Sequence, residues 1–342
     1  MDRALTPAPG ASWVPAQIRW TAAGPVVDWC HLGDLRFVAP FFEQTINDAM
    51  AHPFNRLFRH STPLAPVEPD GLELRPRGLI FHMSRCGSTL VSQMLAALPR
   101  NVVLSEPTPI DQILHAAGRL SDNQIAILLR GMTAALGRRR GAQERDLFVK
   151  LEGWHVLRLP LIRRAFPDVP WVFLYRDPLE VLASLSDLRP HRMLPGGIDA
   201  ALLGGDAAAH AMSPDAYSAL VLRRVCEAAI AHAADGSGLL IEYRDLPRAA
   251  CGVLLDHFGL RYEVEELACM NEAARFDAKS PRRLYVDDSE AKRHGAGEEI
   301  RNLAAELAPL YARLDALRLQ LAARGQGSSA PSASSSGPSI PA

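Results

Sequence analysis

Short apolar runs, separated by helical patterns, dominate the chain from residue 78 onward. Each run has four to six residues, is rich in Val, Ile, Leu and Phe, and ends at polar or turn residues, as buried strands do. The predicted strands are Gly78–Met83, Asn101–Leu104, Leu147–Leu151, Trp171–Tyr175 and Gly238–Tyr243. The clearest predicted helices are Thr89–Leu98 and Ser121–Leu136. Strands that alternate with helices predict an α/β fold, with a doubly wound, mostly parallel sheet as the middle of three layers.

The segments outside this pattern set the predicted domain boundaries. Residues 1–75 contain a stretch rich in Trp and Phe, which predicts a small N-terminal subdomain. They also contain most of the proline-rich residues 60–77, which predict a linker or an extended crossing segment. The subdomain would either pack on the main domain, residues 76–298, or act as a separate lid that reads a substrate. Residues 326–342 are too poor in apolar residues to order themselves and predict a disordered tail.

A leucine-rich helix is predicted between the main domain and the tail, over residues 299–325. Its apolar residues recur at alternating steps of three and four, which is a heptad seam. The seam consists of Ile300, Leu303, Leu307, Leu310, Leu314, Leu317 and Leu321. Because three heptads with Pro309 among them are marginal alone, the seam predicts either docking on the chain's own core or a homodimer through this helix. Both alternatives stay open.

Composition and charge exclude several classes of function. The 342 residues carry 37 Lys and Arg against 38 Asp and Glu, so no overall positive charge recruits nucleic acid or an anionic membrane. The longest run of the sheet region without a polar interruption is Trp171–Tyr175, which is far shorter than the roughly 20 residues of a membrane-spanning helix. Five cysteines without a CxxC pair indicate neither a disulfide framework nor a zinc site. Since residues 1–20 also lack the apolar core of a secretory signal, we expect a cytoplasmic protein.

One predicted strand runs directly into a helix through the turn SRCGST, residues 84–89. Gly87 permits a tight turn, and the N–H groups and dipole at the helix start favour a bound phosphate or sulfate. Arg85 adds a cation, and Ser88 and Thr89 add hydroxyl donors. The turn is not a Walker A motif, because no Lys precedes Ser88. Taken alone, the segment also fits an ordinary strand-to-helix turn.

A second polar cluster, RDPLEVLAS, follows the predicted strand Trp171–Tyr175. Arg176 ends the strand, Asp177 is a good N-cap, and Pro178 fits the first helical turn. Ser184 lies eight residues after Arg176, two turns along the helix. An Arg and a Ser so placed can bind one phosphate together. Taken alone, the segment also fits a surface pair of Arg176 and Asp177.

Together the two segments resemble the sulfotransferase family that uses 3′-phosphoadenosine 5′-phosphosulfate. The turn is similar to the family's K/R-x-G-[ST]-[ST] loop, with Arg85 where Lys is common, and RDPLEVLAS matches its R-[DN]-P-x-[DE]-V-x-x-S motif at every fixed position. A third similarity lies in residues 241–260, which resemble the family's Y-E-D-L … L-x-x-F-L-G-L stretch. The resemblance covers residues 76–290 and implies a P-loop NTPase-like sulfotransferase fold.

The resemblance implies transfer of a sulfuryl group from this donor to a hydroxyl or amine, an EC 2.8.2-type reaction, with a small molecule or glycan as acceptor. The implied cofactor-binding residues are Arg85, Cys86, Gly87, Ser88 and Thr89 for the 5′-phosphosulfate, and Arg176 and Ser184 for the 3′-phosphate. Arg85 would also stabilise the leaving phosphate oxygen. Because a sulfuryl group carries less charge than a phosphoryl group, cationic side chains can replace Mg²⁺, and no metal is expected.

Two carboxylates are candidates for the base that takes the acceptor's proton. Glu106 follows the second predicted strand, where an open α/β sheet places its chemistry, and family members with a catalytic carboxylate carry it there. Glu152 aligns with the His of the family's K-T-H segment. Lys150 matches the Lys of that segment and would stabilise the transferring group. We prefer Glu106, while Glu152 stays open, and the late basic residue Lys279 fits either a loop over the nucleotide or a solvated face.

Two other functions stay open. A P-loop nucleotide kinase would need the Lys that the turn lacks and a Mg²⁺-holding acidic residue at a strand end. A catalytically silent nucleotide-binding or scaffold protein would keep the fold and lose the base, and it ranks last because Glu106 and Glu152 are both present. The sequence does not identify the acceptor.

Overall fold

The computed structural model describes residues 9–65, 71–205, 207–234 and 236–327, and its centre is a parallel sheet of five strands in the order β5-β6-β4-β7-β8. The strands are β4 (Pro76–His82), β5 (Asn101–Ser105), β6 (Asp146–Lys150), β7 (Trp171–Tyr175) and β8 (Gly238–Glu242). Each lies within two residues of a predicted strand. The predicted α/β fold class is confirmed.

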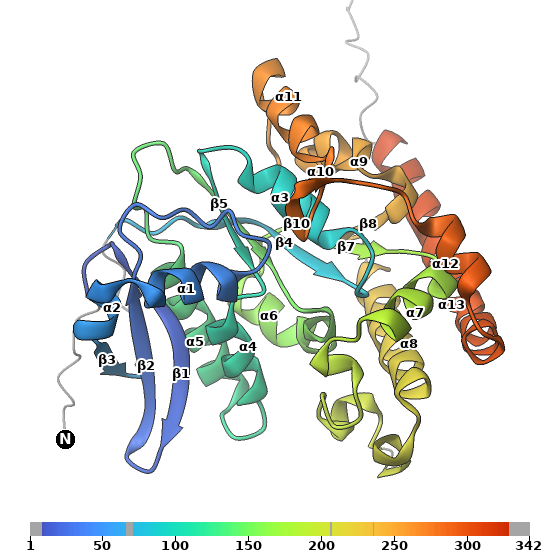
Figure 1. The fold of residues 1–342 in the computed structure, drawn as a ribbon, viewed down its shortest axis with the longest axis horizontal. Helices are drawn as coiled ribbons and strands as arrows, with labels where there is room; N and C mark the ends of the chain where they lie inside the picture. Colours follow the sequence, from blue (N-terminus) through green and yellow to red (C-terminus); the bar gives the residue numbers. More distant parts are fainter. Residues whose placement is uncertain (1–8, 66–70, 206, 235, 328–342) are drawn as a thin grey trace, which may run out of the picture.

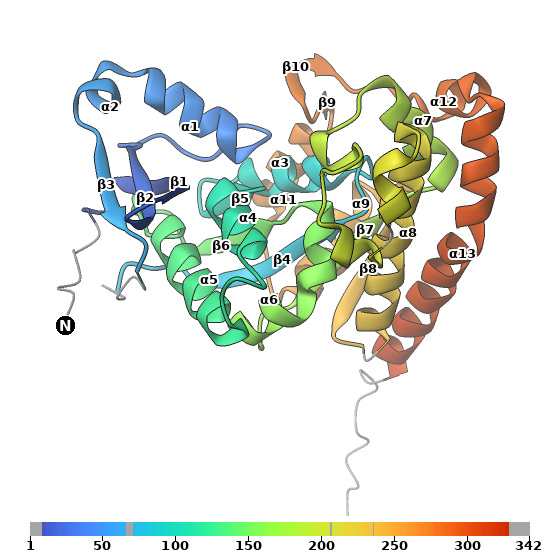
Figure 2. The same cartoon turned by 90° about the horizontal axis from the view of Figure 1, so that it is seen from below.

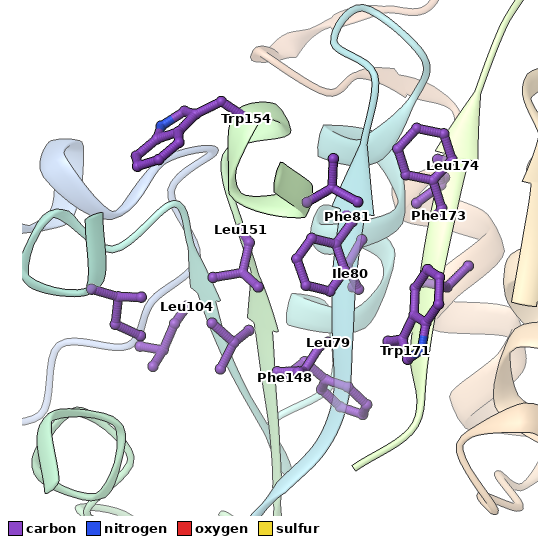
Figure 3. Close-up of a cluster of buried hydrophobic side chains, with 14 of the residues drawn as sticks. Leu79, Ile80, Phe81, Leu104, Phe148, Leu151, Trp154, Trp171, Phe173 and Leu174 are labelled. Atoms are coloured by element: carbon purple, nitrogen blue, oxygen red, sulfur yellow. The ribbon is translucent and has the colours of Figure 1, made fainter. Parts of the chain in front are cut away.

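The strands form a sheet that is buried on both faces. Figure 3 shows Leu79 and Phe81 of β4 between Phe148 of β6 and Trp171 of β7. These four side chains are at most 1% exposed, and the rings of Phe81 and Trp171 meet edge to face with centroids 5.9 Å apart. Burying each such side chain stabilises the fold by roughly 1.5–3 kcal/mol, which explains why the strands are almost continuously apolar.

Helices cover both faces of the sheet, as Figures 1 and 2 show. One face carries α3 (Ser88–Ala96), α9 (Arg248–Cys251), α10 (Val253–His257) and α11 (Val264–Ala273). The other carries α4 (Thr108–His115), α5 (Asp122–Leu136), α6 (Leu159–Ala165) and α8 (Pro214–Ala233). The connection from β4 thus leaves to the opposite side from those of β6 and β7, and the strand ends flank the crevice where such sheets bind their ligands.

Further elements connect these strands and helices or follow them in the chain. The α-helices and strands among them are α7 (Pro178–Asp187), β9 (Phe276–Asp277), β10 (Ser280–Leu284) and α12 (Ser289–Gly295). The 3₁₀ turns are η1 (Gly153–Arg158), η2 (His191–Met193), η3 (Ala200–Leu203), η4 (Ala207–Ala211) and η5 (Tyr243–Asp245).

An antiparallel sheet and two helices lie beside α4 and α5 (Figure 2). The strands of this sheet are β1 (Trp13–Thr21), β2 (Gly24–His31) and β3 (His60–Pro63). The helices are α1 (Phe42–Ala51) and α2 (Pro53–Leu57). Within the segment predicted to be a linker or an extended crossing segment, residues 60–63 are extended and pair with β2. Proline is tolerated there because β3 is an edge strand and Pro63 is its last residue. The domain boundary near residue 75 stays a prediction.

The last helix, α13 (Glu298–Gly327), docks on α7, α8 and β8. Its seam residues Ile300, Leu307 and Leu314 are buried in the same core as the sheet. Of the two predicted alternatives, the helix therefore shows docking on the chain's own core. A homodimer through the seam stays a prediction. The predicted tail, residues 326–342, lies outside the described residues from 328 onward. Among the helices described, none combines the length and hydropathy needed to cross a membrane.

The turn between β4 and α3 depends on Gly87, which has φ +81°. A Cβ there would lie 2.6 Å from Leu246 Cδ1 and 2.9 Å from Tyr243 Cδ2. Gly118 also has a positive φ, +93°, but a Cβ there would meet nothing within 4 Å. The two glycines therefore differ mainly in the space available for a side chain.

We predict that Gly87→Ala lowers the free energy of unfolding by roughly 2–4 kcal/mol, because a backbone penalty of about 1–2 kcal/mol adds to overpacking. Gly118→Ala carries the backbone penalty alone and should cost about 1–2 kcal/mol. Urea unfolding of both variants measures the difference. Equal losses would contradict the close packing of this turn.

Candidate active site

Two cavities lie on either side of the turn that joins β4 to α3. The larger has a volume of about 670 Å³ and the smaller of about 190 Å³. Of the described residues, four line both cavities: Arg85, Ser88, Thr89 and Lys279. Molecules bound in the two cavities would therefore meet at this turn.

The turn presents backbone donors at the start of α3. Its N-cap is Gly87, which gives the helix no side-chain acceptor, so the first N–H groups of α3 are left for another partner. Together with the positive end of the helix dipole, they favour an anion. Ser84 and Arg85 also have positive φ, 79° and 51°, a conformation that non-glycine residues adopt at an energetic cost. Cys86 is fully buried and donates from Sγ to the carbonyl of Leu174 at 3.1 Å, so only its backbone is available to a ligand.

The smaller cavity brings together the two segments singled out in the sequence. Arg85 Nε donates to Ser184 Oγ at 2.7 Å, and both residues line this cavity with Arg176. Arg176 is 4% exposed and donates from Nε to Glu180 at 2.6 Å. The alternative of a surface pair between Arg176 and Asp177 is wrong, because Asp177 instead caps α7 as predicted.

A third wall of the smaller cavity comes from the hairpin β9–β10 and from α12. Arg176 donates to Ser289 Oγ at 3.0 Å and lies 4.0 Å above the ring centroid of Tyr243. The hydroxyl of Tyr243 lies 2.6 Å from that of Tyr285. The late basic segment of the sequence therefore does reach the cavity, and its Lys279 lines both cavities.

Glu106 lies in the larger cavity at the end of β5, with a strained backbone at φ +56°. Its Oε1 accepts a hydrogen bond from Lys150 Nζ and lies 3.3 Å from His82 Nε2. His82 Nδ1 accepts from the backbone N–H of Ser84 at 3.0 Å, which assigns the ring proton to Nε2, facing Glu106. Side chains from the ends of β4 and β6 thus meet at one carboxylate oxygen of the residue that follows β5.

The groups around Glu106 favour its ionised form. Burial alone would raise the pKa of Glu106, but Lys150 and His82 outweigh it and hold that pKa below the ordinary value. Burial also lowers the pKa of His82, which is therefore neutral at pH 7. No described residue donates a hydrogen bond to Oε2 of Glu106. The cavity therefore contains an ionised carboxylate with one oxygen available to a ligand.

Lys150 ends β6, within the predicted strand, but its side chain does not face either cavity. The side chain is completely buried. Besides Glu106, its Nζ donates a hydrogen bond to Ser105 Oγ at 3.4 Å. Its ammonium therefore fixes and charges Glu106 rather than facing a ligand directly.

Glu152 also lines the larger cavity, but in a different setting. Its Oε2 accepts from Arg192 Nε at 3.1 Å and from Trp154 Nε1 at 3.0 Å. Burial and the nearby charge of Asp111 raise the pKa of Glu152 above its ordinary value. Asp111 in turn accepts from Arg192 at 2.7 Å and lies 3.0 Å from His155 Nε2. Arg192 therefore bridges two carboxylates and anchors η2 over the cavity.

The ligand atoms of Asp111, Glu152 and His155 lie within 4.8 Å of one another. Asp111 and Glu152 are far apart in the sequence and adjacent only in the fold. Arg192 bonds both of these carboxylates. His155 Nδ1 accepts from the Glu152 N–H at 3.2 Å, so its Nε2 is a proton donor. These partners do not fit a metal ion, and a metal-independent reaction stays a prediction.

The rest of the larger cavity is mostly apolar. Phe41 comes from the segment before α1, and Trp154, Met193, Ile198 and Val221 come from η1, the loop around η2 and α8. Sequence reasoning missed these residues, as it missed His82 and Arg192. Only His82 carried a signal, since it ends the strand before the turn.

No family model matches the chain, and no curated protein matches it. Solved structures of sulfotransferases are similar to it at low identity. The sulfotransferase domain from the curacin biosynthetic pathway is 15% identical, with 69% of this chain and 98% of that chain covered and a TM-score of 0.41. The sulfotransferase STF1 from Mycobacterium tuberculosis H37Rv is 14% identical, with 69% of this chain and 78% of that chain covered and a TM-score of 0.43. Mouse sulfotransferase SULT7A1 complexed with PAP is 12% identical, with 75% of this chain and 91% of that chain covered and a TM-score of 0.39. At TM-scores below 0.5, these similarities add nothing to what the residues themselves indicate.

Proposed function

We propose that this protein is a sulfotransferase that moves a sulfuryl group from 3′-phosphoadenosine 5′-phosphosulfate to a hydroxyl or amine. The observation that carries the proposal is the turn shared by two cavities. On one side it faces Arg176 and Ser184, and on the other it faces the ionised carboxylate of Glu106. Donor and acceptor sites are thus adjacent, as direct group transfer requires.

The donor would bind in the smaller cavity. The N–H groups at the start of α3 and the hydroxyls of Ser88 and Thr89 would hold the 5′-phosphosulfate. Arg176 and Ser184 would hold the 3′-phosphate. Arg85 already donates to Ser184 and would also face the leaving phosphate oxygen, so it would link the two anion sites. Cys86 and Gly87 would contribute their backbone.

The acceptor would bind in the larger cavity with its hydroxyl or amine beside Glu106. Its oxygen or nitrogen attacks sulfur, the bond from sulfur to the phosphate oxygen breaks, and Oε2 of Glu106 takes the acceptor's proton. Charge develops on the leaving oxygen, where preorganised donors stabilise it without a bound ion. Lys150 positions Glu106 and does not contact the transferring group.

A P-loop kinase is disfavoured by the same contacts. Such an enzyme needs carboxylates at strand ends to hold Mg²⁺, whereas Glu106 is bonded to Lys150 and Glu152 to Arg192. A silent scaffold would have no use for an ionised carboxylate with a vacant oxygen. The acceptor, a small molecule or glycan and not a nucleic acid, and the cytoplasmic location stay predictions.

Adenosine 3′,5′-bisphosphate should bind more tightly than adenosine 5′-phosphate, because only the former fills both anion sites. Losing one charge-assisted contact costs roughly 1.5–3 kcal/mol, so Arg176→Ala should weaken binding by about tenfold or more. Calorimetry measures both effects, and Arg283→Ala is the control because Arg283 is exposed and lines neither cavity. Equal affinities for the two nucleotides would refute the donor site.

Glu106→Gln should reduce turnover by about 10²–10⁴ while nucleotide affinity stays within a few-fold, because Gln keeps the shape and removes the basicity. Glu152→Gln, the matched control, should keep turnover within about tenfold. The pH profile of kcat/KM separates the two carboxylates independently. The lowered pKa of Glu106 keeps it ionised as pH falls, so activity should show no acid limb above about pH 5.

A base at Glu152 would behave in the opposite way. Its raised pKa means that it protonates at a higher pH than an ordinary Glu, so activity would fall on acidification at a pH above the ordinary range of a Glu carboxyl. An acid limb there, together with normal turnover in Glu106→Gln, would move the base to Glu152.

Turnover should survive EDTA, because Arg85 and the start of α3 supply fixed positive charge at the leaving oxygen. Arg85→Ala should abolish turnover. Arg85→Lys should retain part of it, since Lys keeps the positive charge and lacks only the planar set of N–H donors of the guanidinium. Complete inhibition by EDTA that Mg²⁺ rescues would favour the kinase instead.

A further inference from the structure

The junction between the two cavities has walls from two separate parts of the chain. On one side is the turn, with Arg85, Ser88 and Thr89, and on the other is Lys279 of the hairpin β9–β10. A sulfuryl group that passes from a donor in the smaller cavity to an acceptor in the larger one must cross this junction. Any side chain that lines both cavities is therefore placed to contact the group in transfer.

The backbone of Lys279 is held in place by the hairpin. Asp277 Oδ1 accepts hydrogen bonds from the N–H groups of Lys279 and Ser280, at 2.9 and 2.8 Å, and so closes the turn between β9 and β10. Among the described residues, none forms an ion pair with the Lys279 ammonium. Its charge is therefore available to a ligand, in contrast to that of Lys150, which is buried against Glu106.

The charges that face Lys279 come from four elements. Desolvation and the charges of Arg85 and Lys150 lower the pKa of Lys279 to about 8, while Glu106 and Asp277 act in the opposite direction. The free protein therefore carries a cationic Lys279 at pH 7, next to Arg85. No described carboxylate lies within ion-pair distance of either cation, so the two together favour an anionic group between them.

We propose that Lys279 is a catalytic residue that contacts the sulfuryl group during transfer, the role that sequence reasoning gave to Lys150. This inference rests on the proposed function. As the acceptor attacks sulfur and the bond to the phosphate oxygen breaks, Lys279 keeps its protons and donates to the non-bridging oxygens of the sulfuryl group. Arg85 stabilises the leaving oxygen, and the acceptor's proton goes to Glu106.

The test compares Lys279→Met and Lys279→Arg with Arg282→Met, which removes an exposed charge from the same hairpin. Lys279→Met should lower kcat by about 10²-fold, while its Kd for adenosine 3′,5′-bisphosphate stays within about twofold, because this product lacks the sulfuryl group. Lys279→Arg should stay within about tenfold of the wild type, and Arg282→Met should be unchanged. Thermal unfolding of each variant verifies folding.

The pH profile gives a readout that a structural role would not move. In the wild type, kcat/KM should fall as pH rises through about 8, since Lys279 loses its charge there. In Lys279→Arg this basic limb should disappear, because Arg stays charged.

The outcomes separate this inference from the proposed function. Failure of the wild type to bind adenosine 3′,5′-bisphosphate or to transfer the sulfuryl group refutes the proposed function and the inference with it. Normal turnover of Lys279→Met beside an active wild type refutes the inference alone. A parallel loss of turnover and nucleotide affinity would overturn it too, since Lys279 would then bind the nucleotide.

Discussion

A buried ion pair between Lys150 and Glu106 ties the ends of β5 and β6 together, and His82 at the end of β4 faces the same carboxylate. Removing one partner of such a pair leaves an uncompensated buried charge, which costs about 3–5 kcal/mol. The pair therefore constrains three neighbouring strand ends at once. It forms the floor of the larger cavity, and through the hydrogen bond from Ser84 to His82 it also orients the turn above.

The distribution of charge follows from that constraint. In the larger cavity both carboxylates are paired, Glu106 with Lys150 and Glu152 with Arg192. Arg85 and Lys279, which form no ion pair with any described residue, lie at the junction with the smaller cavity. A chain with a net charge of −1 thus concentrates a local positive field where a leaving phosphate oxygen would develop its own negative charge.

The sequence predicts those features of the fold and the site that depend on residues close together in the chain. The strands were recognisable because they are buried on both faces, and the turn and Arg176 because each directly follows a strand. Contacts between distant segments left no such signal. Asp111, Glu152 and Arg192 meet only because α4, η1 and the loop after α7 pack together, and the burial of Lys150 depends on neighbouring strands. Pro63 left a linker and an extended segment both open, because a loop and an edge strand both tolerate proline. The heptad spacing of α13 likewise fits docking and dimerisation equally well.

The central claim is that the turn after β4 separates a nucleotide site from an acceptor site. A crystal structure with adenosine 3′,5′-bisphosphate tests it most directly. The account predicts the nucleotide in the smaller cavity, with its 5′-phosphate at the N–H groups of Ser88 and Thr89 and its 3′-phosphate against Arg176 and Ser184. A nucleotide bound in the larger cavity beside Glu106, or one whose 5′-phosphate lies away from the turn, would contradict it.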